Sequence, residues 1–244
     1  MSLVKITNLG KKYSQKADYT IENINIEGKS GEIIGILGHN GAGKSTTIKC
    51  ITGMHPYEAG SIHICGYEMM DEPIEAKRNF GYVSDDHVLF EKMTGYEFIN
   101  FMADIYKVTK EERIERVNMF QEIFALGDSI YKPISSYSHG MKQKISIMGA
   151  LIHNPRVFIL DEPMVGLDPY TANQVKQFFK THSANGNLVL FSSHNLEVVE
   201  KLCDRAYIID QGRILEEINI KEFKQTGRDL EDYFLSITKR VAKV

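Results

Sequence analysis

The stretch Glu32–Ile48, EIIGILGHNGAGKSTTI, decides the fold of this chain. It begins with an apolar run rich in β-branched residues, which is typical of a buried strand. A glycine-dense turn follows, and from Lys44 to Ile51 the sequence indicates the start of a helix. Within the turn, Gly38–Ser45 fits the pattern G-x-x-x-x-G-K-[ST], in the strand-to-helix context that this pattern requires.

The chemistry of phosphate binding explains these residue types. Glycines let successive backbone N–H groups curl around phosphate oxygens, and the helix N-terminus adds partial positive charge there. Lys44 can then reach the terminal phosphates of a nucleotide, while the Ser45 hydroxyl can hold Mg²⁺. The alternative, a glycine-rich turn that matches by accident, is disfavoured by the flanking strand and helix. We therefore expect a nucleoside triphosphate site whose cofactor contacts are Gly38, His39, Asn40, Gly41, Ala42, Gly43, Lys44, Ser45 and Thr46.

Composition restricts the class of protein. The 244 residues suit one or two domains with a substantial core. A net charge of −3 and a pI near 6.3 give no electrostatic footprint for nucleic acid, so we expect no nucleic-acid partner. Three scattered cysteines indicate a reducing compartment. Because no apolar run approaches the ~20 residues that span a bilayer, we expect a soluble, cytoplasmic chain whose membrane role comes through a partner.

The order of expected elements predicts an α/β fold. Short strands before and after the loop predict an antiparallel β layer leaning on the core, at Leu3–Ile6, Ile21–Ile26 and Gly60–Gly66, with Lys11–Ser14 as a polar loop. Further strands alternate with helices, which implies a largely parallel sheet. They are expected at Phe80–Val83, Val157–Leu160 and Leu188–Phe191, with a final hairpin at Ala206–Leu215 around Gln211-Gly212.

The expected helices define the domain organisation. Helical spacing of apolar residues continues from Val88 to about Leu126, and Ser138 is a plausible N-cap for a helix that runs to about His153. We therefore expect one domain over residues 1–220, with a helical subdomain inserted at about 87–153. The remaining residues 221–244 form a helical tail, whose apolar stripe of Leu230, Tyr233, Phe234 and Ile237 is a docking face.

A second motif completes the expected site. The buried strand Val157–Leu160 places Asp161 at its carboxyl end, where open parallel sheets bind ligands and where the carboxylate can orient Mg²⁺. Glu162 could poise a water molecule as a general base, a role that commonly contributes ~10²–10⁴-fold in rate. The alternative role for Glu162 is a helix-capping or surface carboxylate, which its position directly after four apolar residues disfavours.

With these residues in view, the chain resembles the ATP-binding-cassette (ABC) ATPases over about residues 1–220. Tyr137–Met141 is similar to the family's signature stretch, usually L-S-G-G-Q, and Val165–Asp168 is similar to its D-loop. The resemblance implies the ABC ATPase fold and hydrolysis of ATP with Mg²⁺. It also implies a stacking role on adenine for Tyr13 and a switch role for His194, although a helix-capping histidine is the alternative.

The resemblance further implies partners. Each ATP would lie between one phosphate loop and the signature helix of a second ABC subunit, so Ser138 and Gly140 would act in trans, where a helix N-terminus is worth at most ~2 kcal/mol per charge. A separate membrane-spanning permease would hold the pair at the inner face of the cell membrane. Val88–Thr94 would help to form the groove for that permease, or simply be subdomain core. The stretches Pro73–Tyr106, Met141–Lys144 and Leu230–Leu235 resemble the exporter branch for drugs or lipids.

The chain departs from the family pattern at four positions. Tyr137 replaces a leucine, Met141 replaces a glutamine, and His139 replaces the first signature glycine, which would cost ~1–2 kcal/mol if a left-handed conformation were needed there. Asp85, or else Asp86, stands where a glutamine usually reaches Mg²⁺ and the attacking water; a solvated acidic turn is the alternative. Two other function classes are an ABC-type ATPase of a soluble assembly and a small-molecule kinase, which a membrane-spanning partner would exclude.

Overall fold

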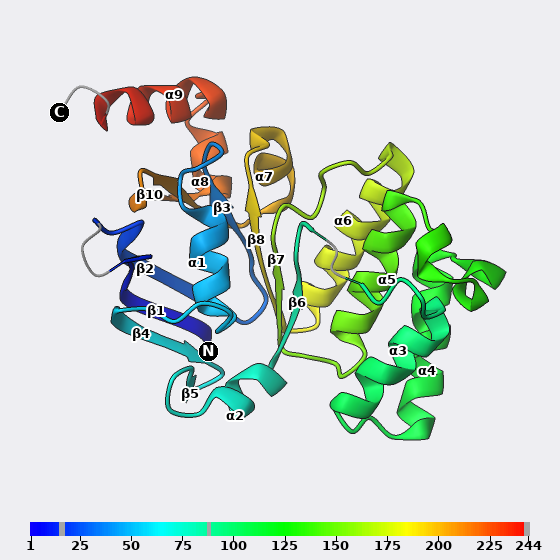
Figure 1. Cartoon of the computed structure of the whole chain (residues 1–244). Coiled ribbons are helices and arrows are strands. Elements are labelled where there is room, and N and C mark those ends of the chain that lie inside the picture. Colours follow the sequence, from blue (N-terminus) through cyan, green and yellow to red (C-terminus); the bar gives the residue numbers. More distant parts are fainter. Residues whose placement is uncertain (15–17, 87–88, 242–244) are drawn as a thin grey trace.

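The computed structural model describes residues 1–14, 18–86 and 89–241, which form two β-sheets and a set of helices (Figure 1). The smaller sheet is antiparallel, with the strand order β2-β1-β4-β5. Strand β2 shows the alternating burial expected of a sheet with one solvated face, and the pairing of the strands confirms the predicted antiparallel layer. Their bounds are β1 Ser2–Lys11, β2 Ile21–Lys29, β4 Ala59–Ile64 and β5 Tyr67–Glu68.

The larger sheet has the strand order β10-β9-β3-β8-β7-β6. The neighbours from β9 to β6 are parallel, and only β10 is antiparallel to its neighbour. The bounds are β3 Ile33–Leu37, β6 Phe80–Val83, β7 Val157–Leu160, β8 Leu188–Ser193, β9 Arg205–Asp210 and β10 Arg213–Asn219. All residues of β3, β7 and β8 are buried, as expected for parallel strands covered on both faces. The carboxyl ends of these three strands therefore meet at one edge of the sheet.

Helices cover both faces of the larger sheet (Figure 1). Helix α1 contacts β2 and β8, between the two sheets, whereas α3, α4 and α5 lie on the far side of β6 from the antiparallel sheet. The bounds are α1 Lys44–Ile51, α2 Pro73–Arg78, α3 Gly95–Ile105, α4 Lys110–Phe124, α5 His139–Leu151, α6 Pro169–Ala184, α7 Leu196–Leu202, α8 Ile220–Gln225 and α9 Leu230–Val241, with 3₁₀ turns η1 Gly127–Tyr131 and η2 Ile134–Ser136.

Strand β3 divides the core into two clusters. Ile34 and Ile36 belong to the cluster between the two sheets, while Ile33 and Leu37 belong to the cluster between the larger sheet and the helices. Successive side chains of a strand point to opposite faces, so this one strand is fixed from both sides. The phosphate-loop pattern therefore starts from a strand that is packed on both faces, as β7 and β8 also are. Together these features confirm the predicted α/β class with a mixed sheet.

Two expectations were wrong in detail. The helix predicted continuously from Val88 to about Leu126 is interrupted. Val88 lies outside the described residues, Leu89–Thr94 is not helical, and a turn separates α3 from α4. Both helices begin at capping boxes, Thr94 with Glu97 and Thr109 with Glu112, in which each glutamate bonds back to the backbone of its threonine. Those reciprocal bonds end the preceding segment and start a new helix, which helical spacing of apolar residues alone does not reveal.

The expected polar loop at Lys11–Ser14 was also partly wrong, because β1 continues through Lys11. Lys11 pairs with Ile21 of β2, and its ammonium donates to Glu58 at 3.0 Å, so the buried charge is neutralised by the carboxylate that directly precedes β4.

The turn between β9 and β10 joins three parts of the fold. The Gly212 N–H donates to Ala42 O at 2.9 Å, and the Gly212 carbonyl accepts from the Glu22 N–H at 2.8 Å. An added Cβ at Gly212 would lie 2.2 Å from Thr20 O, so only glycine fits. Backbone bonds thus tie the phosphate loop to the antiparallel sheet. Within the described residues, none of the helices combines the length and apolar character needed to cross a bilayer.

Candidate functional site

The loop between β3 and α1 has the shape of an anion cradle. Gly41 and Gly43 have φ angles of 84° and 110°, in the region that favours glycine. A Cβ at Gly38 would lie 2.4 Å from Ile209 O, so the backbone of the loop packs directly against β9. Helix α1 has no side-chain cap at Gly43, which leaves its first amides available to a ligand.

Lys44 is held inside this loop. Its side chain is 5 % exposed, and its ammonium donates to the carbonyls of Gly38 at 2.8 Å and His39 at 3.2 Å. The same nitrogen lies 3.2 Å from Glu162 Oε1. The one buried cation of the loop therefore makes an ion pair with the carboxylate that follows β7.

Asp161 lies at the carboxyl end of β7 and is 1 % exposed. Its Oδ1 accepts a hydrogen bond from the Ser192 hydroxyl at 2.5 Å, while the buried Oδ2 has no hydrogen-bond partner among the residues that the structure describes. Burial raises the pKa of Asp161, and hydrogen bonds from Ser192 and Ser45 act in the opposite direction. A buried carboxylate oxygen without a donor is costly, and a cation bound beside Ser45 would satisfy it.

Glu162 is placed between two basic side chains. Its φ of 47° is unusual for a residue with a side chain, and its N–H donates to Ser192 Oγ at 2.9 Å. On the side chain, Oε1 faces Lys44, and Oε2 accepts from His194 Nδ1 at 3.0 Å. The arrangement makes a line from Lys44 through Glu162 to His194, with a carboxylate fixed by groups on both sides.

A cavity of about 280 Å³ opens onto this line. Its walls come from the phosphate loop, the segment after β6, the start of α5, and the ends of β7 and β8. The lining residues are Asn40, Asp85, His139, Glu162, Val165 and His194. Of the two acidic residues expected near the metal, Asp85 is the one in the cavity wall, at an exposed position.

Tyr13 reaches the same loop from the end of β1. Tyr13 is 59 % exposed, with its hydroxyl 3.4 Å from Thr46 Oγ1 and 3.3 Å from His55 Nδ1. The His55 ring meets Tyr13 edge-on, at 5.7 Å between centroids. An exposed aromatic face beside the phosphate loop is suited to stacking on a nucleobase.

The stretch Tyr137–Met141 forms the start of α5. Ser138 is the N-cap, as predicted, and its hydroxyl accepts from the Met141 N–H at 3.3 Å. Tyr137 is buried and donates to Ser129 O at 2.7 Å, which explains a tyrosine at this position. His139 is the first residue of the helix and has no positive φ, so the strain expected from replacing a glycine does not arise. Gly140 follows in the same turn and is half-buried.

Comparison with known proteins shows which family has this site and fold. The profile of the family described as "ABC transporter" matches residues 21–165, more than half of the chain. The chain belongs to the ABC transporter family. The linearmycin resistance ATP-binding protein LnrL of Bacillus subtilis (strain 168) is 37% identical over 213 residues, which cover 87% of this chain and 68% of LnrL.

Solved structures agree with the assignment to the ABC family. A structure described as the ATP-binding subunit of an ABC transporter superposes with a TM-score of 0.90 and 31% identity, over 97% of this chain and 99% of that one. A dimeric ATP-binding cassette in a post-hydrolysis state, bound to ADP and Pi, has a TM-score of 0.79 and 24% identity, over 89% and 98% of the two chains, and shows the fold alone. The chain is an ATP-binding and ATP-hydrolysing subunit of an ABC transporter.

Sequence reasoning missed two residues of this ABC site. Ser192 at the end of β8 is fully buried, and its one hydroxyl serves both the Asp161 side chain and the Glu162 amide. Asp210 at the end of β9 lies with Oδ1 2.5 Å from His39 Nε2. The only sequence signal for either was a polar residue that directly follows an apolar strand run.

His39, one of the expected nucleotide contacts, is held from both ring nitrogens in this ABC subunit. Its Nδ1 donates to the carbonyl of Asn40 at 2.7 Å, while Nε2 donates to Asp210. The bond to Asn40 and then that to Asp210 raise the pKa of His39. Both partners accept hydrogen bonds, so they favour the protonated ring, whose charge is paired with the Asp210 carboxylate.

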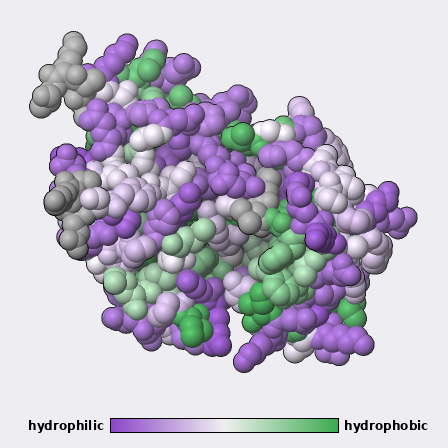
Figure 2. Space-filling view, in the orientation of Figure 1, coloured by the Kyte–Doolittle hydropathy of each residue, from purple (hydrophilic) through white to green (hydrophobic). Residues whose placement is uncertain are grey.

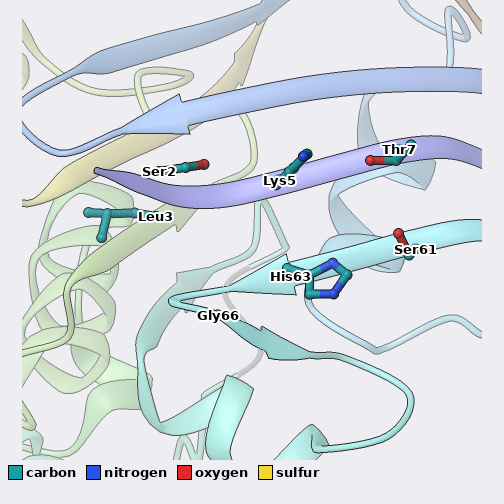
Figure 3. Close-up of a pocket in the computed structure, with 7 residues that line it drawn as sticks. All are labelled: Ser2, Leu3, Lys5, Thr7, Ser61, His63 and Gly66. Carbon is teal, nitrogen blue, oxygen red and sulfur yellow. The ribbon is translucent and has the colours of Figure 1, made fainter.

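A larger hollow of about 430 Å³ lies elsewhere, on the antiparallel sheet (Figure 3). Figure 3 shows Lys5 and Thr7 on β1 beside Ser61 and His63 on β4. The full lining is Ser2, Leu3, Lys5, Thr7, Ser61, His63 and Gly66, which includes no carboxylate and no residue of the family motifs. Its size alone does not make it the nucleotide site of an ABC subunit.

Proposed function

We propose that Glu162 is the general base of ATP hydrolysis, with Lys44 and His194 as the groups that hold it. The observation that carries this role is the line from Lys44 through Glu162 to His194 beside the 280 Å³ cavity. Lys44 would bind the terminal phosphates, and His194 would orient the carboxylate toward a water molecule in the cavity. A base in this position commonly supplies ~10²–10⁴-fold in rate.

The remaining nucleotide contacts follow from the loop. Gly38–Thr46 would cradle the phosphates through backbone amides, and Tyr13 would stack on adenine. Mg²⁺ would be held by the Ser45 hydroxyl and by Asp161, whose buried Oδ2 lacks a donor in the described part of the chain. Mg²⁺ usually takes one or two carboxylates together with substrate phosphates rather than an all-protein cage. Consistently, among the described residues no cluster of three or more His, Cys, Asp or Glu side chains is arranged to hold a metal.

Asp85 supplies a further oxygen at the cavity wall. Because its side chain is shorter than the glutamine usual in the family, we propose that it acts on Mg²⁺ through a water molecule. When bound, the metal would neutralise charge on the phosphates as the bond to the terminal phosphate breaks. The carboxylate of Asp85 would strengthen that binding by charge.

We propose that a second ABC subunit completes the site. The phosphate loop and the start of α5 each offer helix N-terminal amides, and a nucleotide between two chains would meet one of each, with Ser138 and Gly140 acting in trans. The dimeric cassette bound to ADP and Pi is an assembly of this fold. Release of Pi would remove the contacts that hold the two chains together.

A separate membrane-spanning permease would change conformation as the two ATPase subunits close on ATP and open after hydrolysis. Leu89–Thr94 precedes α3 with an exposed Phe90, whose ring meets Phe101 at 5.3 Å, and Glu91 pairs with Lys142 of α5 at 2.8 Å. Figure 2 shows apolar side chains gathered over the helical part of this face. We propose that a cytoplasmic helix of the permease binds against Leu89–Thr94, which would hold the chain at the inner face of the membrane.

The direction of transport is proposed to be export. LnrL is described as a linearmycin resistance protein, and resistance is consistent with the removal of a toxic compound. For domain organisation, we propose a nucleotide-binding domain over 1–220 with a helical subdomain at about 87–153. In the tail 221–244, Tyr233, Phe234 and Ile237 of α9 pack against the core, which supports a docking role.

The proposed base is tested by Glu162→Gln. The amide keeps the shape of the side chain but cannot take a proton, so ATP binding should persist while hydrolysis falls by ~10²–10⁴-fold. Light scattering should then detect an ATP-dependent dimer. Full turnover in this variant would place the base elsewhere, and a variant that stays monomeric with ATP at every concentration would remove the two-chain site.

A further inference from the structure

Helix α5 contacts the turn after β7 at two points. His139 Nε2 lies 3.0 Å from the carbonyl oxygen of Val165, and Gln143 Nε2 donates to the carbonyl of Pro163 at 3.1 Å. Residues 139 and 143 are one helical turn apart, so both side chains leave α5 on the same face. Because a carbonyl oxygen only accepts, His139 carries its proton on Nε2 and donates it.

The imidazole of His139 also covers the backbone of this turn. A Cβ added at Gly166 would lie 2.9 Å from His139 Nε2 and 3.0 Å from its Cδ2, so the ring rests against the Gly166 Cα. Gly166 has a φ of 72°, in the region where a side chain is rarely tolerated. The ring and the glycine are therefore fitted to one another, in addition to the hydrogen bond.

The same turn carries the proposed base. The Val165 N–H donates to the Glu162 carbonyl at 3.2 Å, and Glu162 itself has the left-handed φ of 47°. This conformation is unfavourable for a residue with a Cβ, so neighbouring contacts must maintain it. Gln143 is 1 % exposed and holds the inner side of the turn, whereas His139 holds its outer side, in the wall of the cavity.

We propose that His139 is a positioning residue for Glu162. Together with Gln143, His139 fixes the turn 162–166 to the start of α5. The fixed turn then orients the Glu162 carboxylate toward the cavity. This inference rests on the proposed function, in which Glu162 is the base. It has a mechanical consequence: a displacement of the α5 N-terminus reaches the base of the same chain through two hydrogen bonds.

The first test measures the turn directly, in the full chain without nucleotide. His139→Phe keeps an aromatic ring over Gly166 but removes the donor, while His139→Gln restores an N–H donor. The matched control is His63→Phe, the same replacement on the antiparallel sheet. We expect amide hydrogen exchange in peptides covering 160–170 to be about threefold to tenfold faster in His139→Phe and close to the parent in the other two. Melting temperatures confirm that all variants are folded.

The second test separates positioning from nucleotide binding. Single-turnover hydrolysis by His139→Phe should fall by about threefold to tenfold with ATP affinity unchanged, and His139→Gln should recover the rate. Parent-like exchange in His139→Phe, or faster exchange with an unaltered rate, overturns the proposal. Loss of ATP affinity without loss of rate also overturns it, because His139 would then be a nucleotide contact. Failure of the proposed function is seen separately, as turnover retained by Glu162→Gln.

Discussion

The Ser192 hydroxyl offers the sharpest test of how this site is built. It donates to Asp161 Oδ1 at 2.5 Å and accepts from the Glu162 N–H at 2.9 Å, with no exposure to solvent. Ser192→Ala removes both bonds and leaves two buried groups without a partner. A hydrogen bond to a charged group is worth about 1.5–3 kcal/mol and a neutral one about 1 kcal/mol, so we expect a loss of about 2.5–4 kcal/mol in the free energy of unfolding.

The same substitution should weaken the metal site. Hydrogen bonding from Ser192 lowers the pKa of Asp161 against the effect of burial, so without it the carboxylate takes up a proton more readily. Partners of this kind typically change metal affinity or activity by about 10–100-fold. We therefore expect the Mg²⁺ concentration for half-maximal ATP hydrolysis to rise within that range, and to rise further as the pH is lowered.

Ser193→Ala is the matched control. Ser193 is 4 % exposed, and within the described ranges its hydroxyl makes one hydrogen bond, which it accepts from the Asn195 N–H at 3.0 Å. It should lose about 0.5–1.5 kcal/mol of stability without a change in Mg²⁺ dependence. Denaturant unfolding and Mg²⁺ titration of the ATPase measure both quantities. Equal behaviour of the two variants, or an unaltered Mg²⁺ dependence in Ser192→Ala, would refute the reasoning.

Two further predictions concern residues outside the metal site. Tyr13→Ala should weaken ATP binding by ~1–3 kcal/mol, the usual value of base stacking, and equal affinity by calorimetry would assign Tyr13 to packing. Burial lowers the pKa of His182 to about 4, so its neutral form is stable in the fold while the unfolded chain takes up a proton below about pH 6.5. The free energy of unfolding is therefore lost as the pH falls from 6.5 to 4. His182→Phe should reduce the loss between pH 7 and pH 5 by about 2 kcal/mol, as measured by urea unfolding at both pH values. An unchanged pH profile would contradict this prediction.

Contiguous motifs made much of this ABC fold predictable. The loop Gly38–Ser45 and the pair Asp161-Glu162 each follow an apolar strand run, and the parallel order of β3, β7 and β8 then brings them to one edge. Such motifs are local in sequence, so spacing alone identifies them. The start of α5 at Ser138 was predictable for the same reason, since an N-cap is a property of a few neighbouring residues.

The parts that could not be predicted depend on contacts between distant segments. Ser192 is 31 positions from Asp161, and Asp210 is 171 positions from His39, so no local pattern relates either pair. The contact of His139 with Val165 likewise needs the packing of α5 against the turn after β7. By contrast, the break before α3 was readable, because Thr94 and Glu97 have the spacing of a capping box.

The turn at Gly212 has a consequence for how such a protein can change. Its two bonds, to Ala42 and from Glu22, are made by main-chain atoms, so substitutions of the surrounding side chains leave them in place. A residue inserted between β9 and β10, in contrast, would shift Gly212 out of register with both partners. Length variation in that hairpin should therefore be rare among working ATPases with this joint, however far their sequences diverge.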